Sequence, residues 1–165
     1  MTSLAGCMLA ATGLPDLTHL TDGNATSVKN LQKIVKEMRK SDQKTCDLDA
    51  FELRWDKELN QDLHSKYDVI LSADCLFFKE STENLVQCLY NLLRPNGQAI
   101  ITAPSREGTL VNFANLAEKQ FNVEEVQDYS IEVTKAHESF LDEPGYNPDI
   151  HYPKLLILSK QNCHE

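Results

Sequence analysis

The sequence predicts an α/β fold with a largely parallel sheet. Helical and extended periodicities alternate along the chain, and one extended segment, residues 67–73, is apolar enough for a buried strand. The length of 165 residues, with 41% hydrophobic and 25% charged residues, suits one globular domain and excludes a disordered or fibrous chain. We therefore expect one α/β domain over residues 1–165.

The first third of the chain predicts two helices and two strands. The helices cover residues 1–11 and 25–40, because apolar side chains recur there at spacings of three and four. In the second helix these side chains are Val28, Leu31, Ile34, Val35 and Met38. Strands are expected at residues 17–20 and 48–55, with a polar turn at residues 21–24 after the first strand.

The rest of the chain predicts four more strands. The first is the buried strand 67–73, and the others are residues 98–103, 121–127 and 152–159. Proline cannot donate a ladder hydrogen bond, so Pro153 is tolerated only near the start of the last strand.

Helices are expected between these strands at residues 81–93 and 108–120. The first of them is stopped by the turn at residues 95–97, which contains proline and glycine. Residues 56–66 are polar and predicted to be irregular, and residues 128–150 form a long polar excursion. No internal repeat is visible.

Charge and cysteine content restrict the function. Sixteen Lys and Arg against 25 Asp and Glu give a net charge of −9, which argues against binding of nucleic acid or anionic membranes. Five scattered cysteines, without a CxxC pair or a zinc-binding pattern, predict reduced thiols and no metal site. We therefore expect a cytoplasmic, and also nuclear, protein.

Ligands of open α/β sheets bind at the carboxyl ends of strands, where two side chains of the first half lie. Asp22 follows the first strand and can accept hydrogen bonds from ribose hydroxyls, or form an Asx turn that caps the next helix. Trp55, at the end of the second strand, can lie against an adenine ring, or be a partly buried core aromatic.

The segment at residues 73–77 ends the most apolar strand. A carboxylate beside an aromatic side chain, as in Asp74 and Phe77, is costly there unless it is hydrogen-bonded or functional. The alternative is that Asp74 caps the following helix. Cys75 has no neighbouring histidine to activate it, so we expect a small buried side chain rather than a nucleophile.

Together these segments resemble the seven-strand S-adenosylmethionine-dependent methyltransferases. Within them, the chain is similar to the protein-lysine methyltransferases, which have an acid-x-x-Tyr/Phe motif. Five runs in chain order form the resemblance: Leu-Thr-Asp-Gly-Asn, Leu-Arg-Trp-Asp, Ala-Asp-Cys-Leu-Phe, Asn-Leu-Ala-Glu-Lys and His-Tyr-Pro-x-Leu-Leu-Ile-Leu. The resemblance covers nearly the whole chain. It implies S-adenosylmethionine as cofactor and a lysine of calmodulin as methyl acceptor.

The resemblance also implies roles for five residues. Asp22 binds the cofactor ribose, while Trp55 and the backbone of Ala73 bound the adenosine. Asp74 and Phe77 are placed near the methyl group and the acceptor lysine, as the catalytic pair. Since phenylalanine takes the place that many relatives fill with tyrosine, no role of a phenolic hydroxyl is transferred to Phe77.

One part of the family pattern is absent. A glycine-rich cofactor loop should precede the first helix, but this helix begins at Met1. We therefore expect a Rossmann-like sheet without its first, central strand, which leaves two strand edges unpaired and a partial methyltransferase domain over residues 1–165. Unmade buried hydrogen bonds cost about 1–3 kcal/mol each, so the chain is predicted to fold poorly alone.

Two other functions fit parts of the sequence. One is a catalytically inactive, truncated form of the same fold that interacts with a protein. The other is a nicotinamide-dependent oxidoreductase, since an acid such as Asp22 also binds ribose there. The oxidoreductase is disfavoured because no GxGxxG motif precedes Asp22.

Overall fold

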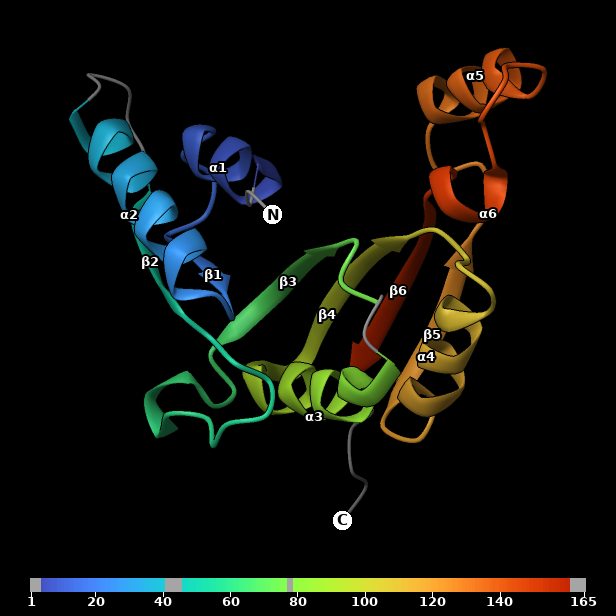
Figure 1. The fold of residues 1–165 in the computed structure, drawn as a ribbon. Helices are drawn as coiled ribbons and strands as arrows, with labels where there is room; N and C mark the ends of the chain where they lie inside the picture. Colours follow the sequence, from blue (N-terminus) through green and yellow to red (C-terminus); the bar gives the residue numbers. More distant parts are fainter. Residues whose placement is uncertain (1–3, 41–45, 77–78, 161–165) are drawn as a thin grey trace. The chain divides into compact units, whose positions relative to one another are not determined.

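The chain folds into two compact units, residues 1–57 (unit 1) and residues 58–165 (unit 2). The computed structural model describes residues 4–40, 46–76 and 79–160, and Figure 1 shows the helices and strands of both units. The expectation of one domain over residues 1–165 stays a prediction.

Unit 1 alternates helix and strand: α1 (Leu4–Ala11), β1 (Leu17–Asp22), α2 (Ala25–Lys40) and β2 (Asp47–Glu52). The two strands form a parallel two-stranded sheet. The sequence predicted all four elements, with both ends of α2 at the expected residues. The second strand ends three residues earlier than predicted, because residues 53–55 leave the sheet as a loop and turn.

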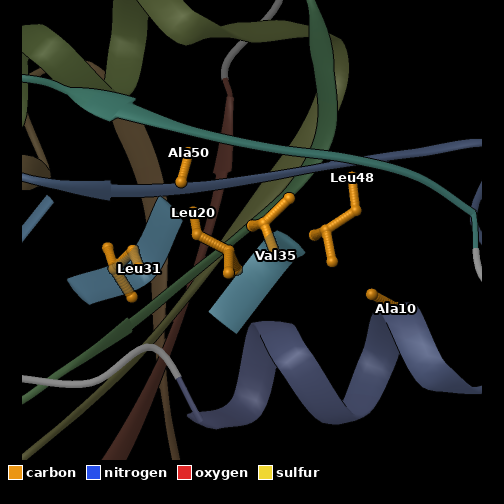
Figure 2. Packing of buried hydrophobic residues seen from close by; sticks show 6 residues of the cluster. All are labelled: Ala10, Leu20, Leu31, Val35, Leu48 and Ala50. Carbon is orange, nitrogen blue, oxygen red and sulfur yellow. The ribbon is translucent and has the colours of Figure 1, made fainter. Parts of the chain in front are cut away.

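The core of unit 1 lies between these helices and strands. Six buried side chains form it, and Figure 2 shows them pointing toward one another: Ala10, Leu20, Leu31, Val35, Leu48 and Ala50. Helix α2 is also tied to the sheet through side chains that donate to β2 carbonyls, Gln32 to Ala50 at 3.2 Å and Arg39 to Leu48. The alternation of buried and exposed residues in β2 follows from this one-sided cover.

Unit 2 contains a four-stranded sheet in the order β3-β4-β6-β5. Its strands are β3 (Tyr67–Ala73), β4 (Leu93–Ala103), β5 (Phe121–Val126) and β6 (Lys154–Lys160). β3 pairs with β4 in parallel, whereas β6 is antiparallel to both β4 and β5. The sheet is therefore mixed rather than largely parallel, because β6 returns between two parallel strands.

The described part of unit 2 contains four short α-helices. These are α3 (Thr82–Leu92), α4 (Thr109–Ala117), α5 (Ile131–Phe140) and α6 (Pro148–His151). Two 3-10 turns, η1 (Gln61–Leu63) and η2 (Lys79–Ser81), precede β3 and α3. The long polar excursion expected at residues 128–150 thus contains two helices. None of their side chains is buried, so no apolar periodicity revealed them.

One face of the unit 2 sheet is covered by α3 and α4, which contact each other as well as β4 and β5. Ala99, Ile101 and Ala103 of β4 point to this face and are buried, together with Leu156 and Leu158 of β6. The turn predicted at residues 95–97 lies inside β4, where Asn96 has a φ of 65°.

The bounds of β3 are those predicted, but the predicted burial of this strand was wrong. Val69 and Leu71 are 49% and 41% exposed. Among the described residues, β3 pairs only with β4 and β1 only with β2, so each has one edge without a strand partner. An edge position, with one sheet face open, explains the exposure of a sequence that reads as a central strand.

In the part of the chain that the structure describes, no helix has both the length and the apolar character needed to cross a membrane.

We predict that Gly97→Ala lowers the free energy of unfolding of unit 2. A Cβ at this position would lie 3.0 Å from the carbonyl oxygens of Arg94 and Tyr67, and at the same distance from Cδ2 of Leu93. Two of these three atoms belong to the backbone and cannot move aside, so a loss of about 1–3 kcal/mol is expected. Chemical denaturation followed by circular dichroism measures it.

The matched control is Gly23→Ala, where a Cβ would find its nearest neighbour at 3.6 Å, an ordinary contact. An equal loss of stability in both variants would show that close packing around Gly97 is not the cause.

Candidate functional site

Asp22 lies at the carboxyl end of β1 and is half-buried. Its Oδ1 accepts a hydrogen bond from the backbone N–H of Asn24 at 2.8 Å. The cap of α2 is Asn24 itself, whose Oδ1 accepts from the N–H groups of Thr26 and Ser27. Asp22 thus forms an Asx-type turn without capping the helix directly, and its predicted role toward a ribose stays a prediction.

Trp55 lies in a turn three residues beyond β2 and is half-buried. The pairing of β1 with β2 brings this turn close to Asp22. Asp22 is opposite Glu52 in the register, and the carbonyl of Asp22 accepts a hydrogen bond from the N–H of Leu53 at 3.1 Å. Two of the predicted cofactor residues therefore lie at the same end of the unit 1 sheet. The half-buried position of Trp55 agrees with contact to an adenine ring and also with a partly buried core aromatic.

Ala73 and Asp74 lie at the carboxyl end of β3, in unit 2. Ala73 is exposed and pairs with Thr102 of β4, whose carbonyl accepts from the N–H of Asp74 at 2.7 Å. Asp74 is not the cap of α3, since that position is occupied by Ser81. Phe77, the other predicted catalytic residue, lies outside the described residues.

Arg106, in the loop after β4, is the partner of Asp74. Its Nη2 lies 2.9 Å from Oδ1 and 3.0 Å from Oδ2 of the carboxylate, and donates to Oδ2. Oδ1 is itself buried and accepts no hydrogen bond from the described residues. The pair therefore offers a buried acceptor atom whose negative charge is compensated by a neighbouring cation.

The backbone at this edge of the unit 2 sheet is strained. Asp74, Arg106 and Glu107 have φ values of 52°, 42° and 52°, in the left-handed region that side chains other than glycine seldom adopt. Gly108, with a φ of 84°, follows them. Such outliers persist only where the surrounding structure fixes them, and they cluster at functional sites.

The α5–α6 segment is attached to this loop. The carbonyl of Asp149 accepts from the N–H of Arg106 at 2.8 Å, and its Oδ2 accepts from the N–H of Glu107 at the same distance. Within the segment, the ring of His137 lies 4.3 Å from that of Tyr152, and its Nδ1 is 2.6 Å from the hydroxyl of Tyr146. An aromatic cluster thus adjoins the loop of Arg106.

Cys75 is half-buried, with its Sγ 2.6 Å from Oγ of Ser72. Burial raises the pKa of this thiol, the Ser72 hydroxyl opposes the rise, and the negative charge of Asp74 adds to it. A raised pKa disfavours a nucleophilic thiolate, in agreement with the sequence reading. Among the described residues, no cluster of three or more His, Cys, Asp or Glu side chains is suited to hold a metal ion.

Sequence reasoning missed Arg106. The signal was present, because residue 106 follows the predicted strand 98–103 at the end where ligands bind in α/β sheets. Only the structure, in which Arg106 pairs with Asp74, singles out this cation.

Solved structures share this fold across most of the chain. A methyltransferase from Pyrococcus furiosus aligns with a TM-score of 0.58 and 13% identity over 87% of this chain and 62% of its own. The YcgJ protein from Bacillus subtilis gives 0.63 and 10% over 96% and 89%. The N-methyltransferase NodS from Bradyrhizobium japonicum, crystallised with S-adenosyl-L-homocysteine, gives 0.56 and 10% over 87% and 66%. The fold is that of the S-adenosylmethionine-dependent methyltransferases.

The chain belongs to the lysine methyltransferase family, whose sequence model matches residues 2–121. A curated relative, the calmodulin-lysine N-methyltransferase of Arabidopsis thaliana, is 27% identical over 96% of this chain. The match covers 54% of that relative, so the chain spans about half its length.

We predict that Arg106→Gln slows alkylation of Cys75. Without the guanidinium, the charge of Asp74 is uncompensated and raises the pKa of the thiol further, so less thiolate is present near pH 8. A decrease of about threefold is expected for iodoacetamide, measured by mass spectrometry of the Cys75 peptide.

The control is Arg94→Gln, which removes another pair, between Arg94 and Asp68 at 2.8 and 3.0 Å near the start of β3. It should leave Cys75 unchanged. Faster alkylation in Arg106→Gln would mean that the residue acts by packing rather than by charge.

Proposed function

We propose that the protein is an S-adenosylmethionine-dependent methyltransferase that modifies a lysine of calmodulin. The family match over residues 2–121 is the observation that supports methyl transfer to lysine. The Arabidopsis relative supports calmodulin as the acceptor. Four described cysteines are free thiols, the usual state in reducing compartments, and support a cytoplasmic and nuclear location.

The residues at the carboxyl end of unit 1 fit the nucleoside part of the cofactor. A half-buried carboxylate, Asp22, accepts hydrogen bonds from the two ribose hydroxyls. Trp55, in the adjoining turn, provides a flat apolar face for adenine. In unit 2, the backbone of Ala73, an exposed residue, is assigned to the adenosine by the resemblance. When bound, S-adenosylmethionine supplies a methyl group on a sulfonium, which a neutral amine attacks in line.

Asp74 is the residue we assign to the acceptor lysine, and the resemblance assigns Phe77 to the same lysine, as a ring for the cation before deprotonation. The Asp74 carboxylate, whose side chain is 36% exposed, accepts a hydrogen bond from the incoming amine and so orients it. A lone carboxylate would raise the pKa of the lysine and keep it as an ammonium, which cannot attack. Arg106, at 2.9–3.0 Å, compensates that charge, while entry into a partly apolar site lowers the lysine pKa by desolvation.

The alternative function is a non-catalytic interaction module with the same fold. It is favoured by the open edges of β1 and β3, each of which pairs on one side only among the described strands. Cofactor binding distinguishes the two, because an interaction module has no need of S-adenosylmethionine.

We predict that Asp22→Ala weakens binding of S-adenosylmethionine at least tenfold. The loss follows from two hydrogen bonds between the carboxylate and the ribose, each of which contributes about 1.5 kcal/mol when the acceptor is charged. Isothermal titration calorimetry measures both affinities. Absence of binding by the unaltered protein would favour the interaction module.

We predict that Asp74→Asn reduces methyl transfer to purified calmodulin at saturating cofactor by about tenfold or more, because the amine loses its orienting charge. Methylation is measured by mass spectrometry of the modified peptide. Asp68→Asn, at an exposed aspartate of β3, is the control and should keep the original turnover. Unchanged turnover in Asp74→Asn would remove this residue from the mechanism.

A further inference from the structure

A row of four lysines lies along α2, in unit 1. Lys29, Lys33, Lys36 and Lys40 are spaced by four, three and four residues, and all are exposed. At 3.6 residues per turn, these spacings place the four Cβ atoms within an arc of about 60°. We refer to these four residues as the lysine row.

The buried side chains on the opposite face of α2 determine which way the lysine row points. Val28, Leu31 and Val35 are buried, and Leu31 and Val35 belong to the core cluster in Figure 2. Because these side chains hold one face of the helix on the β1–β2 sheet, the lysine row faces away from that sheet.

The lysine row is only partly neutralised within its own helix. Neighbours in the row are three or four residues apart, so each neighbouring pair brings like charges together and destabilises the helix. Among the described residues, only Lys40 of the row makes an ion pair, with Glu37 at 2.7 Å. The fold alone gains nothing from this arrangement, because alternating Glu and Lys would stabilise α2 better.

The charge of the chain is unevenly divided. Residues 1–57 contain eight Lys and Arg and eight Asp and Glu, whereas residues 58–165 contain eight basic and 17 acidic residues. An acidic partner is therefore repelled by unit 2, and the lysine row concentrates the positive charge of unit 1.

A shallow hollow adjoins the lysine row. It is lined by residues of α2 and β2: Gln32, Val35, Lys36, Arg39, Lys40 and Asp49. Three of the six are basic, so an acidic side chain of a partner finds cations on α2 around this hollow.

We infer that the lysine row of α2 is the docking surface for the acidic protein substrate. This inference rests on the proposed function, in which the substrate is calmodulin. EF-hand proteins such as calmodulin are rich in carboxylates, and an acidic surface is complementary to a row of ammonium groups. The row supplies the local positive charge that a chain of net charge −9 otherwise lacks for such a partner.

The test is the association of the full chain with purified calcium-loaded calmodulin, followed by stopped-flow fluorescence at several salt concentrations. Lys33→Gln combined with Lys36→Gln should lower the association rate about tenfold at low salt and flatten its salt dependence. The dissociation rate should change less, because exposed charges act mainly before contact.

The matched control is Lys119→Gln combined with Lys135→Gln, two exposed lysines of unit 2 that change the net charge equally. This variant should associate like the unaltered chain. Equal slowing in both double variants would overturn the inference, because it would show an effect of net charge alone. No binding of calmodulin by the unaltered chain would overturn it as well.

Methyl transfer separates this inference from the proposed function. Binding through the lysine row without any transfer of methyl groups would contradict the proposed enzyme and leave the docking surface in place. Transfer at an unchanged rate and unchanged KM for calmodulin in Lys33→Gln with Lys36→Gln would overturn the docking surface and leave the enzyme in place.

Discussion

The parallel pairing of β3 with β4 is the constraint on which the candidate acceptor site depends. Parallel strands end at the same edge of a sheet, so the pairing of Ala73 with Thr102 brings Asp74 beside the loop that follows β4. A shift of the register by one residue would turn every side chain of β3 to the other face. The ion pair between Asp74 and Arg106 therefore exists only in the observed register.

The same edge joins three segments that are distant in sequence. Asp74 follows β3, Arg106 follows β4, and Asp149 of α6 accepts hydrogen bonds from the backbone of that loop. Left-handed backbone at Asp74 and Arg106 is maintained by these contacts rather than by glycine. Within unit 2, the α5–α6 segment is thereby attached to the loop whose Arg106 pairs with the carboxylate that we assign to the acceptor lysine.

The sequence predicts helices and strands correctly where the periodicity of apolar residues is strong. It does not predict which side chains meet through long-range contacts. Residues 25–40 and 67–73 were predicted with both ends at the observed positions, because an amphipathic helix and an apolar strand are local patterns. Helices α5 and α6 were missed since they bury no side chain. The partnership of Asp74 with Arg106 joins residues 32 apart, and no local pattern encodes it. The resemblance to lysine methyltransferases, based on five short runs, was confirmed by the family match.

The exposed strand β3 has a consequence for the behaviour of the protein in solution. An extended segment that pairs on one side only among the described strands, with Val69 and Leu71 open to solvent, is a template onto which other chains can add strands. Charged residues flank its beginning, since Lys66 and Asp68 are half-buried or exposed beside Tyr67. Such charges hinder stacking of identical segments, so Lys66 and Asp68 oppose aggregation of the protein at high concentration.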